Sequence, residues 1–256
     1  MDDKARGVSF ASKRVQAGRN AEAHVAEILY SKVKEIINAS RTFISANGIT
    51  REEELTTIAK NITLTAEKQI EDYLSAYANA SYRNLGIESN NLDSFLKGNI
   101  FGKTFAQRNT TYLGHFASDI VRMIKAGSML GYNNDKILSA IRTGYKEPYL
   151  SSIITKAAKK DINIKIPSYG KGIFKSAYRN IIRNVRHTIA LAWGQAEQEY
   201  GKQKGAIGFH VFRGSSFPCP ICDDECSYIH KIGESYPPYH YNCVCYIKFI
   251  FPENNK

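Results

Sequence analysis

The chain has 256 residues, of which 43% are hydrophobic and 23% are charged. These fractions are those of an ordinary globular protein, so they exclude a wholly disordered chain, and the length allows one large domain or two smaller ones. The formal net charge of +11 favours polyanionic partners such as nucleic acid, anionic lipid or an acidic protein.

The beginning of the chain is polar and basic. Its first residues, MDDKARGVSF, lack the apolar core of a signal peptide. Residues 1–19 show no apolar periodicity, and we predict a flexible basic arm there. No run approaches the roughly 20 apolar residues that a membrane-spanning helix needs. We therefore expect a chain that is made and used in a cytoplasm, without a membrane partner.

Residues 20–204 are predicted to form a helical domain, because apolar residues recur there at helical spacing. One helix starts near Asn20, and a second follows Thr50, which forms a capping-box pattern with Glu53. Gly86 is a plausible stop for the second helix. The segment from Ile124 to Ile141 has the pattern of a helix, a glycine-containing turn and another helix.

A loop is predicted over 162–172, and a long helix over about 173–200. The stretch 156–187 holds nine basic residues and one acid. On the long helix, basic side chains recur at steps of four, four and three. They form either a solvated helix face or a surface for DNA phosphates or an acidic protein. These candidate nucleic-acid-binding residues are Lys175, Arg179, Arg183 and Arg186.

Residues 205–256 form a third region, a Cys/His-rich subdomain with short strands. GFHVFRG and VCYIKFIF are predicted as strands, because they are rich in β-branched and aromatic residues. All five cysteines lie within residues 219–245, so four fall between the two strands and Cys245 lies at the start of the second. The predicted fold class is mainly α: an elongated helical body with a small C-terminal α+β knob that binds zinc.

The cysteine spacing suggests a metal site. Cys219 and Cys222 form a Cys-x-x-Cys pair, and His240 and Cys243 follow across a loop. Thiolates and neutral imidazoles suit tetrahedral Zn²⁺, and four such ligands leave no open position, so the metal would be structural. Alternative ligands are present nearby: Cys245 could replace His240 or Cys243, and Cys226 and His230 are weaker candidates.

Two other interpretations of the cysteines stay open. They can be small buried hydrophobic residues. They can also form a disulfide between Cys219 and Cys222, or a pairing with Cys243 or Cys245. Five cysteines cannot all pair internally, and clustered thiols beside a histidine in a reducing compartment favour a metal.

The cysteine segment resembles the C-terminal signature of the phage Mu F-like family of minor head proteins. That signature has Cys-x-x-Cys, a short insert with a glycine, and then Pro-Pro-x-His-x-x-Cys-x-Cys. The tail of the match here is PPYHYNCVC, which follows Gly233. Tyr241 and Val244 stand where the family usually has proline and arginine. Helical pieces upstream extend the resemblance to roughly residues 115–250.

The resemblance implies a role in building the head of a tailed bacteriophage. Family members are minor capsid proteins associated with the portal, and they act in procapsid assembly or in DNA packaging and delivery. The implied partners are portal, capsid and scaffold proteins, and packaged double-stranded DNA. The implied location is the virion, after synthesis in the host cytoplasm.

Two rival functions belong to other classes. A zinc-stapled His-Asn-His nuclease would need a histidine base that is not a zinc ligand, and His240 cannot serve as both. A zinc-dependent nucleic-acid-binding regulator is disfavoured because residues 219–256 carry five acids and three bases. We therefore predict a protein that is not an enzyme and has no catalytic residue.

Overall fold

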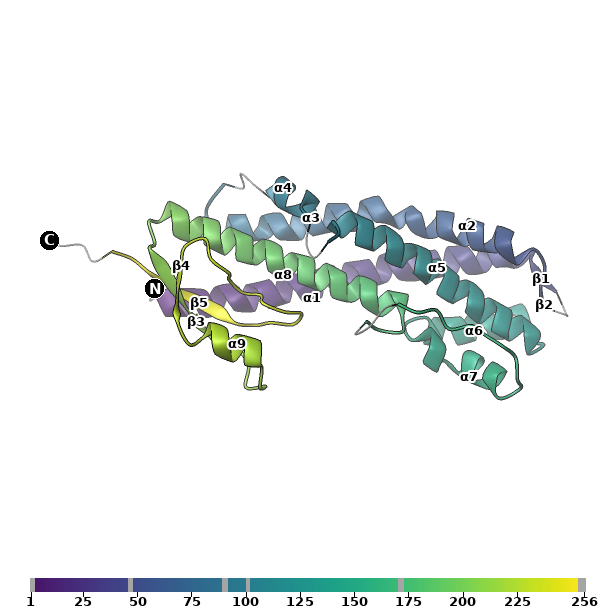
Figure 1. Ribbon diagram of the computed structural model, residues 1–256. Helices are drawn as coiled ribbons and strands as arrows, with labels where there is room; N and C mark the ends of the chain where they lie inside the picture. Colours follow the sequence, from purple (N-terminus) through teal and green to yellow (C-terminus); the bar gives the residue numbers. More distant parts are fainter. Residues whose placement is uncertain (1–2, 46–47, 89–91, 100–101, 170–172, 253–256) are drawn as a thin grey trace. The chain divides into compact units, whose positions relative to one another are not determined.

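A computed structural model describes residues 3–45, 48–88, 92–99, 102–169 and 173–252. It is mainly helical with a small sheet near the C-terminal end of the chain, as Figure 1 shows, which confirms the predicted class. The helices are α1 (Asp3–Ser40), α2 (Glu52–Leu64), α3 (Ala66–Leu85), α4 (Leu92–Lys97), α5 (Phe105–Met129), α6 (Asn134–Gly144), the short 3₁₀ turn η1 (Pro148–Leu150), α7 (Ser152–Ala158), α8 (Ala177–Gln203) and α9 (Pro220–Glu225). The strands are β1 (Ile44–Ser45), β2 (Gly48–Ile49), β3 (Gly208–Phe212), β4 (Ile229–Lys231) and β5 (Tyr246–Ile250).

The chain divides into two compact units, and each is built from separate segments of sequence. Unit 1 comprises Met1–Ala23, Asp72–Gly98 and Val185–Lys256, and unit 2 comprises His24–Glu71 and Asn99–Asn184. The predicted boundaries at residues 19/20 and 204/205 do not coincide with the boundaries of these two units. The unit boundaries fall inside α1, α3 and α8, where a helical pattern continues without a break that sequence reasoning could detect.

The predicted flexible arm over 1–19 is also wrong for the residues that the structure describes there. Residues from Asp3 onward belong to α1, and a buried face recurs along it at steps of three, one, three, three and one. Its members are mostly glycine, alanine and one arginine, so their hydrophobicity is low and the period is hard to see in the sequence. They are Gly7, Phe10, Ala11, Arg14, Ala17 and Gly18.

Unit 2 is helical and centres on the buried face of α5. Gly127 on α5 allows α6 and α7 to pack closely, because a Cβ there would lie 2.6 Å from the side chains of Ile137 and Ile153. The predicted helix–turn–helix is confirmed: Gly131 adopts a φ of 72°, and the Asn133 side chain caps α6 by accepting a hydrogen bond from the Lys136 N–H.

The predicted capping box at Thr50 and Glu53 is wrong. α2 begins at Glu52 after Arg51, whose φ is 53°, and no side chain caps it. Thr50 instead donates its hydroxyl hydrogen bond to the Phe43 carbonyl, next to the β1–β2 pair. A threonine hydroxyl can form a hydrogen bond with whichever backbone group is nearer. The sequence alone does not show that the Phe43 carbonyl lies nearby.

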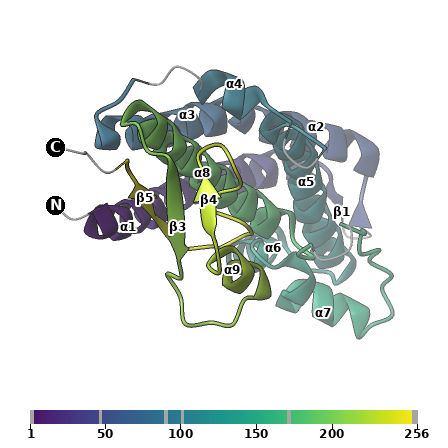
Figure 2. The same ribbon diagram turned by 60° about the vertical axis from the view of Figure 1, so that its left-hand side comes forward.

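Unit 1 contains the antiparallel sheet β4-β3-β5, and both predicted strands are confirmed. The side chains of β5 alternate between half-buried and buried, so Ile247 and Phe249 face a core with Phe209 of β3. Cys222 of α9, Cys243 and Cys245 belong to the same core. Figures 1 and 2 show α9 beside the strands. In the described part of the chain, no helix has the length and apolar character needed to cross a membrane.

Candidate metal centre

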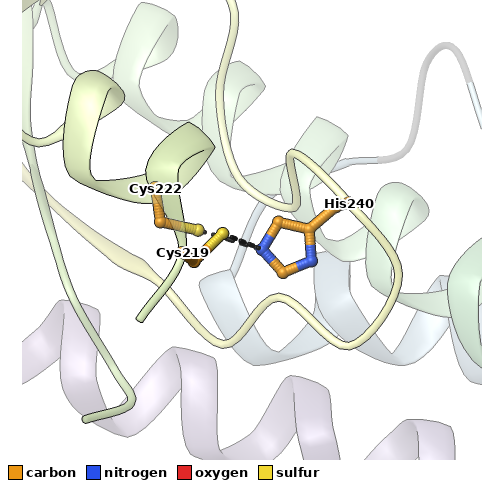
Figure 3. A group of neighbouring side chains, drawn as sticks. All are labelled: Cys219, Cys222 and His240. Carbon is orange, nitrogen blue, oxygen red and sulfur yellow. Dashed lines mark hydrogen bonds between the residues drawn. The ribbon is translucent and has the colours of Figure 1, made fainter. Parts of the chain in front are cut away.

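The sulfur and imidazole groups of unit 1 converge in space, and we call them the Cys/His cluster: Cys219, Cys222, His240, Cys243 and Cys245. The Nε2 atom of His240 lies 3.2 Å from the Cys219 sulfur and 3.0 Å from the Cys222 sulfur, as drawn in Figure 3. The sulfurs of Cys222 and Cys243 are 3.9 Å apart. Two groups of three, Cys219–Cys222–His240 and Cys222–Cys243–Cys245, each have all ligand atoms within 4.8 Å of one another. Cys222 is common to both.

The first pair of sulfurs is positioned by the start of α9. Cys219 is the residue before the helix, with an extended backbone, and Pro220 occupies the first helical position. Proline is favoured there because its fixed φ suits the helix and its missing N–H has no helical partner. The first turn of α9 carries Cys222, and its Sγ faces the same histidine as Cys219.

His240 and Cys243 are brought close together by a tight turn. The Cys243 N–H donates a hydrogen bond to the His240 carbonyl at 3.2 Å, which closes the His-x-x-Cys segment. Asn242 within it adopts a φ of 63°. Asparagine tolerates this left-handed conformation better than most residues, so the sequence suits the turn.

The orientation of His240 leaves Nε2 ready to bind a cation. Its Nδ1 lies 2.7 Å from the Tyr241 carbonyl oxygen, which can only accept, so Nδ1 carries the proton. Nε2 faces the sulfurs of Cys219 and Cys222. Metal-bound histidines commonly have this arrangement, with the other ring nitrogen held by a carbonyl or carboxylate.

The electrostatics of the cluster favour one thiolate and oppose several. A hydrogen bond from the Cys245 thiol lowers the pKa of Cys243 to about 5, with help from backbone N–H groups and from the nearby Arg14 guanidinium. Burial raises the pKa of Cys222 to about 12. The pKa of Cys245 is also raised, chiefly by its hydrogen bond to Cys243. Without a cation, additional thiolates are therefore disfavoured in this buried space.

This geometry could hold a metal ion. In a tetrahedral centre with metal–sulfur bonds of about 2.3 Å, neighbouring sulfurs are about 3.8 Å apart. The Cys222–Cys243 separation of 3.9 Å is close to that value. A divalent ion would also supply the positive charge that allows several buried thiols to ionise.

Two weaker ligand candidates stand outside this arrangement. Cys226 packs against the same core but belongs to neither group of three found among the described residues. The buried His230 places its Nε2 2.8 Å from the Glu225 carbonyl and stacks on Phe209. All five cysteines are free thiols in this structure. The disulfide interpretation therefore has no direct support here.

Arg14 is a neighbour of the cluster that sequence reasoning missed. It lies on α1, is 2% exposed, and its Nη2 donates a hydrogen bond to the Cys245 carbonyl at 2.6 Å. Arg14 falls within the predicted flexible basic arm, because a basic residue among alanines and glycines gives no sign of burial. The separation of 231 residues between Arg14 and Cys245 hides the contact from any local pattern.

The four candidate nucleic-acid-binding residues differ in the ion pairs and ring contacts that they form. In unit 2, Arg179 forms an ion pair with Glu147 at 2.6 Å, and its guanidinium lies 4.4 Å from the centre of the Phe174 ring. The Arg183 guanidinium lies 5.6 Å from the same ring. Lys175 is exposed.

Arg186 belongs to unit 1, where it has acceptors of its own. It forms a two-point ion pair with Glu22, at 2.5 and 2.6 Å, and donates to the Asn242 side chain at 2.9 Å. Its charge is therefore partly offset within the protein.

Comparisons of the chain with protein-family models, with curated proteins and with solved structures found no match.

Proposed function

We propose that the Cys/His cluster binds one structural Zn²⁺ through Cys219, Cys222, His240 and Cys243. The observation that carries this proposal is the approach of both sulfurs of the Cys-x-x-Cys pair to Nε2 of His240, whose Nδ1 is held by the Tyr241 carbonyl. Three sulfurs and one nitrogen match the preference of zinc, and four protein ligands complete its tetrahedral shell.

Cys243 is the better fourth ligand than Cys245. Its sulfur lies near that of Cys222, and its pKa is the one that is lowered within the cluster. Cys245 would remain a neutral thiol that donates to the Cys243 sulfur. Hydrogen bonds of this kind orient ligands and tune the metal from the second coordination layer.

A structural metal suits the small size of this part of the protein. The sheet contains strands of five, three and five residues, and α9 has six residues. Such short elements bury little apolar surface, so a metal crosslink between α9 and the turn before β5 contributes directly to folding.

For the whole chain, the function that the residues support best is that of a minor capsid or head morphogenesis protein of a tailed bacteriophage. The support is the resemblance of the segment from Cys219 to Cys245 to the Mu F-like signature. The basic net charge also suits a particle filled with DNA. Portal, capsid and scaffold proteins are the proposed partners, packaged DNA is a further one, and the virion is the proposed location.

A nuclease of the His-Asn-His kind is the competing proposal, and the contacts of its two key residues argue against it. His240 faces two thiols with Nε2 and a carbonyl with Nδ1. The Asn242 side chain accepts a hydrogen bond from Arg186. Neither group is left to activate water or to orient a substrate, so the proposed role is not catalytic.

The proposed role in the phage head can be tested on particles produced by the cells whose genome encodes this chain. We expect mass spectrometry to find the chain in purified heads, and deletion of its gene to reduce the yield of DNA-filled heads. Double-stranded DNA incubated with the purified protein and Mg²⁺ or Mn²⁺ should stay intact. Absence from heads together with normal particle yield would contradict the role, and cleavage lost in His240→Ala would favour the nuclease.

A further inference from the structure

The sheet of unit 1 has two edges. In the order β4-β3-β5, the outer side of β4 and the outer side of β5 have no neighbouring strand among the described residues. A strand edge can pair with a strand of another chain unless the protein shortens, interrupts or covers it. β4 has only three residues, whereas β5 has five. The longer edge, on β5, is therefore the one that needs a cover.

The first turns of α1 lie along the β5 edge, as Figures 1 and 2 show. The Phe249 N–H donates a hydrogen bond to the Asp3 carboxylate at 2.6 Å. The carbonyl of Cys245, directly before β5, accepts a hydrogen bond from the Arg14 side chain at 2.6 Å. Backbone groups of alternate residues point to the same side of a strand, so both contacts belong to one edge. Side chains of a helix thus take the place of a fourth strand.

The residue between these two contacts meets a glycine. A Cβ on Gly7 would lie 2.1 Å from the Ile247 carbonyl oxygen, whereas real Cβ atoms are essentially never closer than 3.0 Å to such a neighbour. The carbonyl belongs to the backbone of a paired strand, so it cannot move aside as the end of a flexible side chain could. Glycine is therefore required for α1 to approach the edge this closely.

The spacing of these contacts agrees with the geometry of the two elements. From Asp3 to Gly7, a helix advances by about 6 Å at 1.5 Å per residue. From Phe249 back to Ile247, a strand advances by about 6.8 Å at 3.4 Å per residue. The helix and the strand therefore stay in step while they run in opposite directions, which makes the contacts one continuous cover.

The covered strand has the composition of a segment that pairs with itself. Residues 246–251, YIKFIF, contain one charged residue and neither glycine nor proline. Such segments have a strong tendency to form intermolecular sheets. In an antiparallel pair of two β5 strands centred on Ile247, Lys248 lies opposite Tyr246, so the two lysines do not face each other. The same edge on both copies gives a two-fold contact, which closes on itself.

We propose that residues 3–14 of α1 cover the edge of β5, and that displacing them allows β5 to pair with β5 of a second copy of this chain. The inference goes beyond the proposed function and uses neither the metal nor its ligands. It gives the start of α1 a specific task, which is to keep an adhesive strand from association through its backbone.

The main test is Gly7→Ala in the full chain. Alanine is the better helix former, so α1 itself should not be weakened, but the new Cβ should push it away from β5. We expect the Phe249 amide to exchange with solvent about tenfold faster or more, because it loses a charged acceptor. Sedimentation velocity should show association that increases with concentration beyond that of the wild type.

Gly18→Ala is the matched control, because it makes the same change on the same helix. Its Cβ would lie 3.4 Å from the Arg186 Cγ, which is an ordinary contact. We expect wild-type exchange and wild-type sedimentation. Wild-type behaviour of Gly7→Ala in both measurements would overturn the inference. It would also be overturned if the Phe249 amide lost its protection in Gly7→Ala while sedimentation stayed that of the wild type.

A second variant keeps the inference testable if Gly7→Ala does not fold. Asp3→Ala removes the acceptor of the Phe249 N–H without adding an atom, so the same two changes should follow with smaller size. Association through β5 also has its own signature. At high concentration, the amides of Ile247 and Phe249 should become protected again, because a second β5 strand now accepts from them. Association that leaves both amides exchanging rapidly would mean another surface and would overturn the inference.

Discussion

The two units each bury a polar cluster, but the clusters differ in what the protein supplies to them. In unit 2, Asp119 is 1% exposed and accepts hydrogen bonds from the Tyr149 hydroxyl at 2.7 Å, the Tyr169 hydroxyl and the Ala177 N–H at 3.1 Å. Arg122 lies 3.4 Å away and adds a positive charge. The chain itself therefore provides the donors and the cation that this carboxylate needs.

The Cys/His cluster of unit 1 has no comparable set of donors and cations aimed at its sulfurs among the described residues. Its groups are thiols and an imidazole lone pair, which become mutually repulsive when the thiols ionise. The nearby cation, Arg14, donates to a backbone carbonyl. The difference is that the Asp119 carboxylate already has its donors within the protein, whereas the converging sulfurs and imidazole nitrogen of the Cys/His cluster could hold a cation.

The largest expected effect comes from removing the sulfur common to both groups of three. Cys222→Ser should abolish stoichiometric zinc binding and lower the stability of unit 1 by more than about 4 kcal/mol, the range reached when a structural metal is lost. Thermal unfolding and metal analysis of the purified variant measure the two effects.

Cys226→Ser is the matched control for that variant. It changes the same residue type in the same subdomain, outside both groups of three. We expect it to keep its zinc and to lose at most about 1–2 kcal/mol. Equal losses in the two variants would mean that the cysteines act only as packing residues, and the contrast between the units would disappear.

A smaller effect is expected in unit 2. Asp119→Asn keeps the size of the side chain but turns an amide N–H₂ group toward at least one of the existing donors. The free energy of unfolding should fall by about 1–3 kcal/mol, because a buried donor is left without an acceptor. Exposed Asp135→Asn should change stability by less than about 1 kcal/mol. Zinc content should be normal in both, and zinc loss in Asp119→Asn would show that the clusters are not independent.

The difference in stability between the wild type and Asp119→Asn should also depend on pH. Burial raises the pKa of Asp119, and this outweighs the lowering by Tyr169, Tyr149 and Ala177. A carboxyl with a higher pKa in the folded state contributes stability that is fully present below its unfolded value and is lost as the pH rises through the folded value. The stability of the wild type relative to Asp119→Asn should therefore decrease as the pH rises above the ordinary pKa of an aspartic acid.

Urea unfolding of the two proteins at several pH values measures this dependence. Loss of the metal in acid affects both proteins equally, so it cancels in the difference. A difference that increases with pH would contradict the assignment and would mean that the hydrogen bonds to the ionised carboxylate outweigh its burial.

The smallest effect is expected from the basic residues of α8. Arg179→Glu with Arg183→Glu should reduce the slope of log binding constant against log salt for duplex DNA by about 2 if both residues contact phosphates. Lys34→Glu with Lys60→Glu, on other helices of unit 2, makes the same change in net charge. Equal slopes in the two double variants would assign the DNA affinity to net charge alone.

Much of the fold was predictable because it is encoded locally. The helix–turn–helix pattern between Ile124 and Ile141 and the β-rich segments of β3 and β5 each gave correct elements. The buried start of α1 could not be predicted in the same way, since its inner face consists largely of glycine and alanine. The unit boundaries inside continuous helices likewise leave no mark in the sequence.

The site was predictable in its residues but not in its surroundings. The spacing of Cys219, Cys222, His240 and Cys243 indicated ligands. The structure places the first three in one group, and it places Cys243 with Cys222 and Cys245 in a second group. Arg14 and the Asp119 cluster were missed, because their importance lies in contacts between segments far apart in the chain. A charged residue in a weakly periodic stretch looks solvated until its neighbours are known.

The most direct test is the metal content of the full chain, purified under reducing conditions and analysed by elemental mass spectrometry and X-ray absorption. The account predicts about one zinc per chain, with about three sulfur ligands at 2.3 Å and one nitrogen ligand at 2.0 Å. A chain that is folded, contains five titratable free thiols and takes up no zinc when it is offered would contradict it.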